Sequence, residues 1–283
     1  MDRRGFLGGL GVTASLVGAG TFMAEETKIR DVRAHGRAVA YGPAPGPTAT
    51  TLLWRVDTSR MIAALTFDDG PDPRYTPGII DILEAHGAVA TFFMQGSHVE
   101  SHPDLAQAVA ERHALGNHTY SHPDLGNAPA EQAAEEIDRA TDAIERVVGQ
   151  STRLFRPPYG RFSGATSMIA ARLGFDIILW SDRLDSKATP QSNVGRLSRS
   201  LRQGDILLGH DGGTLPNQTV VDSLGGILDN LEAQGIETVT VPELMRVARI
   251  EPTTRSGADA DTDADVEAPD LAAGAVETVT RRR

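Results

Sequence analysis

The chain has 283 residues, of which 40% are hydrophobic and none is cysteine. Its formal net charge is −11, which argues against a nucleic-acid-binding protein because such proteins usually carry a basic face. The lack of cysteine excludes disulfides, thiolate catalysis and thiolate metal ligands, so any transition metal has to be held by His, Asp or Glu.

The two ends of the chain differ in composition from its middle. Residues 1–24 place Arg3 and Arg4 before a mildly apolar run rich in Gly and Ala, which resembles a twin-arginine export signal more than a membrane anchor. Residues 25–52 are expected to be an extension and linker, and residues 251–283 a disordered acidic tail. We therefore expect an exported protein, located outside the cell or at the cell wall.

Between residues 53 and 250, apolar runs of strand length alternate with helical patterns. Strands are predicted at 61–67, 88–94, 154–158, 175–180 and 204–210, and helices at 76–87, 102–116, 129–149, 164–174 and 223–235, with 236–245 closing the set. Such alternation predicts an α/β fold with a parallel sheet covered by helices. Six or seven units of this size favour a barrel, although periodicity alone leaves its closure open.

Polar clusters follow several of these segments. They read DDGPD, GNHTYSH, RPPYG, SDRLD and HDGG in chain order. Because the carboxyl ends of parallel barrel strands converge on one face, we expect these five clusters to line one pocket.

Two of the clusters carry residues with metal-binding chemistry. Asp68 and Asp69 follow the first strand, where they could serve as a metal ligand and a proton acceptor or simply form a turn. His118 and His122 are spaced by four residues, which suits a metal but also arises by chance. Together, one Asp and two His make a three-ligand set for a catalytic divalent metal, with zinc as the default.

The ordered set TFDDG, HTYSH, RPPYG, SDRLDS and LGH resembles the polysaccharide deacetylases with a NodB-type domain, the carbohydrate esterases of family four. The resemblance runs from Leu53 to Arg249, so a deacetylase domain is expected over residues 53–250. It implies a distorted (β/α) barrel with about seven parallel strands. It also implies removal of acetyl groups from the N-acetylated sugars of a polysaccharide.

The resemblance also assigns roles around the metal. It implies that Asp68 is the general base and that Arg156 orients it. Asp69, His118 and His122 would hold one divalent ion, zinc first, with Co, Ni or Fe as alternatives. A guanidinium beside a carboxylate would favour its charged form, which agrees with the role given to Arg156.

Further roles fall on the later motifs. The backbone N–H of Tyr159 would stabilise the oxyanion, and Leu208 would line the pocket for the acetyl methyl group. His210 would be the general acid, paired with Asp185, or with Asp182 as the fallback. Trp180 is balanced between the core and the floor of the sugar groove.

The sequence departs from the family pattern at two positions. Ser186 stands where the family usually has Trp, and Gly209 where a bulkier apolar residue is common. Both departures are expected to open the groove and alter substrate choice, without removing a catalytic group.

Several functions remain in competition. The preferred partner is an acetylated polysaccharide or oligosaccharide, either peptidoglycan or a chitin-like oligomer, with acetylated xylan as an alternative. No nucleic acid or protein partner is implied, and a monomer is expected. A non-catalytic carbohydrate-binding relative, a magnesium phosphatase and a non-haem iron oxygenase are the other readings. A binding relative would need a lost catalytic group. A magnesium phosphatase does not explain the histidine pair, because Mg²⁺ prefers oxygen ligands. An oxygenase leaves Asp68, Arg156 and His210 without a role.

Overall fold

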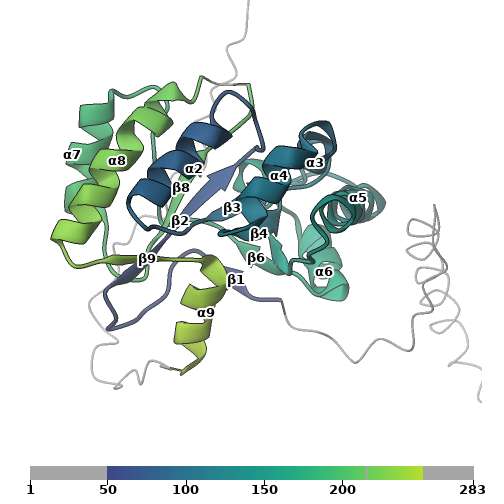
Figure 1. The fold of residues 1–283 in the computed structure, drawn as a ribbon. Coiled ribbons are helices and arrows are strands. Elements are labelled where there is room, and N and C mark those ends of the chain that lie inside the picture. Colours follow the sequence, from purple (N-terminus) through teal and green to yellow (C-terminus); the bar gives the residue numbers. More distant parts are fainter. Residues whose placement is uncertain (1–49, 215, 251–283) are drawn as a thin grey trace, which may run out of the picture. The chain divides into compact units, whose positions relative to one another are not determined.

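The computed structural model of this chain describes residues 50–214 and 216–250, which are organised around parallel strands (Figure 1). Eight strands follow the order β1-β6-β5-β4-β3-β2-β8-β7, and β9 pairs with β2. The sheet curls into a barrel. This barrel is open, because its end strands β1 and β7 do not pair with each other in the described region. The strands are β1 (Leu52–Leu53), β2 (Ile62–Asp68), β3 (Thr91–Met94), β4 (Ala114–Asn117), β5 (Leu154–Phe155), β6 (Asp176–Ile178), β7 (Asp182–Arg183), β8 (Ile206–His210) and β9 (Glu237–Val239).

Helices cover the outside of this sheet. Figure 1 shows α2, α7 and α8 on one side of the central strands and α3 to α6 gathered on the other. The helices are α2 (Thr76–Ala85), α3 (Gly96–Ser101), α4 (Pro103–Ala110), α5 (Ala130–Val148), α6 (Gly164–Leu173), α7 (Pro190–Ser200), α8 (Gln218–Ala233) and α9 (Val241–Ile250), with a 3-10 turn η1 (Pro158–Gly160). The α/β class predicted from alternation and the distorted barrel implied by the resemblance are both confirmed.

The alternation of side chains along β2 places the site. Ala63, Leu65 and Phe67 belong to the core cluster under the helices. Ile62 and Ala64 belong instead to the inner cluster, which also contains residues of α9. Because side chains two residues apart share a face, Thr66 and Asp68 continue this inner face. It is therefore apolar where β2 begins and polar where β2 ends.

The predicted helix over 102–116 is wrong in its second half. Helix α4 ends at Ala110, and residues 114–117 form β4 beside β3. Gly116 makes this pairing possible, because a Cβ there would lie 2.3 Å from the Phe93 ring. A close approach to a neighbouring side chain, which periodicity does not encode, therefore decides the element.

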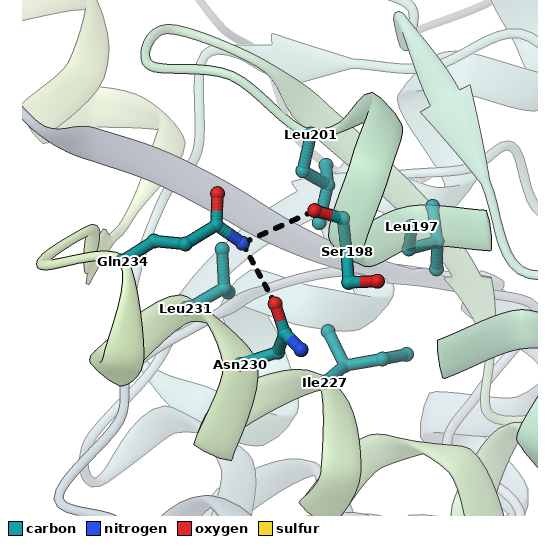
Figure 2. A pocket seen from close by; sticks show the side chains of 7 residues that line it. All are labelled: Leu197, Ser198, Leu201, Ile227, Asn230, Leu231 and Gln234. Atoms are coloured by element: carbon teal, nitrogen blue, oxygen red, sulfur yellow. Dashed lines mark hydrogen bonds between the residues drawn. The ribbon is translucent and has the colours of Figure 1, made fainter. Parts of the chain in front are cut away.

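Helix α7 was not predicted, because its sequence PQSNVGRLSRS is polar and contains a glycine. Its start nevertheless carries a helix signal, since the Thr189 side chain accepts a hydrogen bond from Ser192 N–H and Pro190 is the first helical residue. Figure 2 shows the shallow hollow between α7 and α8, where the Gln234 amide donates to the Ser198 carbonyl and to Asn230 Oδ1. None of the residues that line this hollow belongs to the polar clusters.

The strand number exceeds the predicted seven, because very short strands such as β1 and β7 also pair in the sheet. The predicted export signal 1–24, nearly all of the extension 25–52 and the acidic tail 251–283 lie outside the described residues. Among the described residues, none of the helices combines the length and apolar composition that a membrane span requires.

Candidate metal centre and active site

The predicted site residues come together at the carboxyl ends of neighbouring strands. Asp68 is the last residue of β2 and lies opposite His210, the last residue of β8. On the other side of β3, Asn117 ends β4 opposite Phe155 of β5, so His118 and Arg156 both follow strand ends. Parallel pairing therefore brings four of the five polar clusters to one edge of the sheet.

Arg156 forms a buried contact with Asp68. Its Nη1 donates to Asp68 Oδ1 at 2.7 Å and to Thr66 Oγ1 at 2.8 Å. Its Nε and Nη2 donate to the carbonyls of Ile178, the last residue of β6, and Leu179. The side chains of Arg156 and Asp68 are 0% and 4% exposed. The guanidinium thus fixes the carboxylate in position and supplies a positive charge that solvent does not screen.

Asp69, His118 and His122 form the cluster that could hold a metal, with three ligand atoms within 4.8 Å of one another. Asp69 Oδ1 lies 3.1 Å from His122 Nε2 and 3.5 Å from His118 Nε2. His118 Nδ1 lies 2.7 Å from the Arg156 carbonyl oxygen, which can only accept, so this nitrogen carries the proton. In neutral His118 the lone pair is then on Nε2, facing Asp69, as a metal ligand requires.

The charges in the cluster act differently on its two histidines. Burial lowers the pKa of His118 despite the attraction of Asp68 and Asp69, which favours the neutral, ligating form. Burial alone would raise the pKa of Asp69, but the hydrogen bond from His122 and the charges of His118, His122 and His210 hold it well below its usual range. Burial would lower the pKa of His122, yet its hydrogen bond and attraction to Asp69 raise it. This favours the protonated form of His122, so a metal that binds there has to displace a proton.

Two residues that the sequence analysis missed also contact Asp69. Gln95 Nε2 donates to Asp69 Oδ1 at 2.9 Å, and His98 Nδ1 donates to the Asp69 carbonyl at 2.7 Å. Gln95 follows β3 directly, so its place at a strand end was a signal that could have found it. His98 lies on the short helix α3, which was not predicted.

Backbone strain is concentrated in the motif turns. Within the described region, the non-glycine residues with positive φ are Asp69 at 74°, Thr119 at 64°, His122 at 63° and Tyr159 at 59°. Conformations of this kind persist where surrounding contacts enforce them, and they cluster at functional sites. All four belong to the segments that surround the candidate metal centre.

The residues predicted to bind substrate lie around this centre. The Tyr159 side chain is 58% exposed, and its ring contacts the His122 ring edge-on, with 4.7 Å between centroids. Trp180 is half-buried below Gly160, where a Cβ would lie 3.0 Å from its ring. Leu208 is buried and lies two residues before His210, so both side chains leave β8 on the same face. Their binding roles stay predictions.

The predicted pairing of His210 with Asp185 is not formed in the described region. Extending the register of β7 against β8 would place Asp185 opposite His210. Asn193 instead holds the backbone N–H and carbonyl of Asp185, whose side chain accepts from Lys187 N–H. Asp182, the fallback, accepts from Arg196 and Ser200 of α7. Helix α7, which the sequence analysis did not foresee, therefore binds the carboxylate of Asp182 and the backbone of Asp185.

The expectation for Gly209 is corrected as well. A Cβ at Gly209 would lie 2.9 Å from the Phe67 ring and 3.2 Å from the Leu184 side chain. Both neighbours belong to the core cluster under the helices. Gly209 therefore faces away from Leu208 and His210, and it does not open the groove. Ser186 is half-buried, and it remains the departure that can affect the groove.

A further buried carboxyl group follows His210. Asp211 is 1% exposed and accepts a 2.7 Å hydrogen bond from Thr76 Oγ1 at Oδ2, while its Oδ1 has no partner among the residues that the structure describes. Its backbone N–H donates to the Asp68 carbonyl, and a Cβ on Gly70 would lie only 1.9 Å from its carboxylate. Burial raises the pKa of Asp211 to about 8. Asp211 therefore packs tightly against the turn that carries Asp68 and Asp69.

Comparisons with known proteins lead to the same family as the motifs do. Residues 55–178 match the family model described as polysaccharide deacetylase. The chain is 40% identical over 200 residues to a peptidoglycan-N-acetylglucosamine deacetylase of Bacillus cereus, covering 69% of this chain and 93% of that protein. It is 33% identical over 183 residues to a chitooligosaccharide deacetylase of Azorhizobium caulinodans, covering 63% of this chain and 87% of that protein.

A solved structure shows the same fold. The crystal structure of a peptidoglycan N-acetylglucosamine deacetylase in complex with a naphthalenyl N-hydroxybenzamide superposes with a TM-score of 0.66 and 31% identity. The match covers 68% of this chain and 92% of the other.

Proposed function

Because the chain belongs to the polysaccharide deacetylase family, we propose that it hydrolyses the acetamide of N-acetylated sugars with the help of one divalent metal ion. The observation that carries the proposal is the Asp69, His118 and His122 cluster beside the buried pair of Arg156 and Asp68. This arrangement combines a candidate metal site with a second, separately held carboxylate.

The donor set fits a transition metal better than Mg²⁺, since two of its three members are imidazoles. Zinc is the first candidate, and Co, Ni or Fe would suit the same ligands. When bound, such an ion polarises a carbonyl and makes water a stronger acid.

The protein's own groups would supply the proton transfers. Asp68, fixed by Arg156, takes a proton from the attacking water. His210, opposite Asp68 on β8, gives a proton to the departing amine. The backbone N–H of Tyr159 donates to the oxygen on which negative charge develops, and Leu208 contacts the acetyl methyl group.

The substrate we favour is peptidoglycan. In support, the Bacillus cereus relative is named for this polymer and is aligned over 93% of its length. The export pattern at Arg3 and Arg4 would deliver the protein to the cell wall. Chitin-like oligomers are the second candidate substrate, because the Azorhizobium caulinodans relative is named for chitooligosaccharides. O-acetyl xylan is the alternative ester substrate.

A non-catalytic carbohydrate-binding role is the competing function. It would be favoured by the loss of a ligand, base or acid, but Asp68, Asp69, His118, His122 and His210 are all present. The retained set therefore supports an enzyme.

The test is acetate release by metal-loaded protein from peptidoglycan fragments, chitin oligomers and acetylated xylan. Asp68→Asn protein and a chelated sample serve as controls. We expect acetate from peptidoglycan, lost in both controls. Acetate from another substrate alone would overturn the choice of polymer. Metal binding without acetate from any substrate would instead support the binding role.

A further inference from the structure

Helix α5 carries a carboxylate that contacts the loop between the two candidate metal ligands, His118 and His122. None of the residues of α5 belongs to a family motif. Glu136 is 7% exposed and faces the segment that carries His122. Its Oε2 accepts from Tyr120 N–H at 3.0 Å and from Ser121 N–H at 2.8 Å, and its Oε1 accepts from Ser121 Oγ at 2.7 Å. One buried carboxylate thus satisfies three donors of two consecutive loop residues.

The loop needs such support. Thr119 and His122, on either side of these two residues, both have positive φ. A β-branched residue in this region is strained, so the conformation persists only where contacts enforce it. Within the described residues Glu136 forms no ion pair, so its carboxylate is engaged by the loop rather than by a basic side chain.

The two histidine ligands are held by different parts of the fold. His118 continues β4, with its N–H bonded to the Met94 carbonyl and its Nδ1 to the Arg156 carbonyl. The position of His122 depends on the turn before it, where its N–H donates to Thr119 Oγ1. The hydrogen bonds of Glu136 are therefore to the turn that precedes His122 and not to the strand end that carries His118.

A second group of contacts anchors the start of the same loop to α5. The Asn117 amide donates to the Ile137 carbonyl and to Thr141 Oγ1, while its Oδ1 accepts from Thr119 N–H. The helix thus holds both halves of the turn. Contacts of this kind hold the loop in the geometry that the ligand needs.

From these contacts we infer that Glu136 is a positioning residue that sets His122 for metal binding. The inference rests on the proposed metal-dependent function. Groups that orient a ligating histidine typically change metal affinity by about 10- to 100-fold when removed. Glu136 does so through the backbone of the loop rather than through the imidazole itself.

The test measures the dissociation constant for Co²⁺ and Zn²⁺ on metal-free protein, together with the visible absorption of bound Co²⁺. Glu136→Ala is expected to weaken binding by about 10- to 100-fold and to change the Co²⁺ spectrum, since His122 is no longer held. Glu136→Gln should retain near-normal binding, because its oxygen can accept both N–H groups and its amide can donate to Ser121 Oγ. Glu135→Ala, which removes an exposed carboxylate from the same helix, is the matched control and should bind as the unmodified protein does.

Glu136→Asp provides a second test in case Glu136→Ala does not fold. It keeps the charge but is one methylene shorter, so it cannot reach all three donors, and we expect weaker metal binding by a folded protein. Unchanged affinity and Co²⁺ spectrum in folded Glu136→Asp or Glu136→Ala would overturn the inference. Failure of the unmodified protein to bind either metal would instead overturn the proposed function.

Discussion

Arg156 and Asp68 lie 88 residues apart in the sequence, yet their side chains meet at 2.7 Å where neither is exposed to solvent. Burial lowers the pKa of Arg156, an effect that the negative charge of Asp68 opposes. Each charge therefore compensates for the burial of the other, and removing one leaves its partner unpaired.

Arg156→Ala should destabilise the protein by about 3–5 kcal/mol, because it leaves the Asp68 carboxylate buried without a partner. Urea unfolding measures the change. Arg161→Ala removes an exposed ion pair with Asp124 and should cost no more than about 1 kcal/mol. If both variants lost the same free energy of unfolding, burial would not be what makes the Arg156–Asp68 contact matter for stability.

Asp68 and Asp69 are adjacent, but substituting them should have different effects on activity and metal content. Asp68→Asn is expected to lower kcat by about 10²- to 10⁴-fold, the usual contribution of a general base, while metal content stays normal. Asp69→Asn should instead lose the metal, because it removes a ligand. Metal analysis and acetate release on the same samples separate the roles. Metal loss from Asp68→Asn as complete as that from Asp69→Asn would show that the assignment is wrong.

Asp211 should make stability depend on pH in the metal-free protein. Its pKa is raised from 3.8 to about 8, so its protonated form stabilises the folded state. This contribution is fully present below the unfolded pKa and is lost as pH rises towards about 8. The free energy of unfolding of Asp211→Asn, measured from pH 4 to pH 8, should fall less than that of the unmodified protein. If the free energies of unfolding of the two proteins changed with pH in parallel, the raised pKa of Asp211 would be contradicted.

Gly209→Ala tests the corrected orientation of that residue. The added methyl group would meet the Phe67 ring and the Leu184 side chain, so we expect a loss of about 1–3 kcal/mol from overpacking. The ratio of activities on peptidoglycan and chitin oligomers should stay unchanged, since Gly209 does not face the groove. A changed ratio at constant stability would restore the view that this position shapes substrate choice.

Local patterns in the sequence were enough for the α/β class and for most of its regular elements, while the barrel came from the resemblance of the motifs. The strand at 61–67, the helix at 129–149 and the helix at 164–174 agree closely with β2, α5 and α6. Periodicity and capping residues are properties of consecutive residues, so they can be read directly. The motif resemblance predicted the candidate ligands and base for the same reason, because each motif is a short stretch of chain.

Tertiary structure decided which groups meet. Gln95 and His98 contact Asp69, and Glu136 supports the His122 loop, although no local pattern links these residues. Asp185 is held by Asn193 of α7 rather than by His210. Gly209 faces the outer core because strand side chains alternate, so one residue of register exchanges the two faces. Contacts of this kind depend on register and on packing between distant segments, which the sequence by itself leaves open.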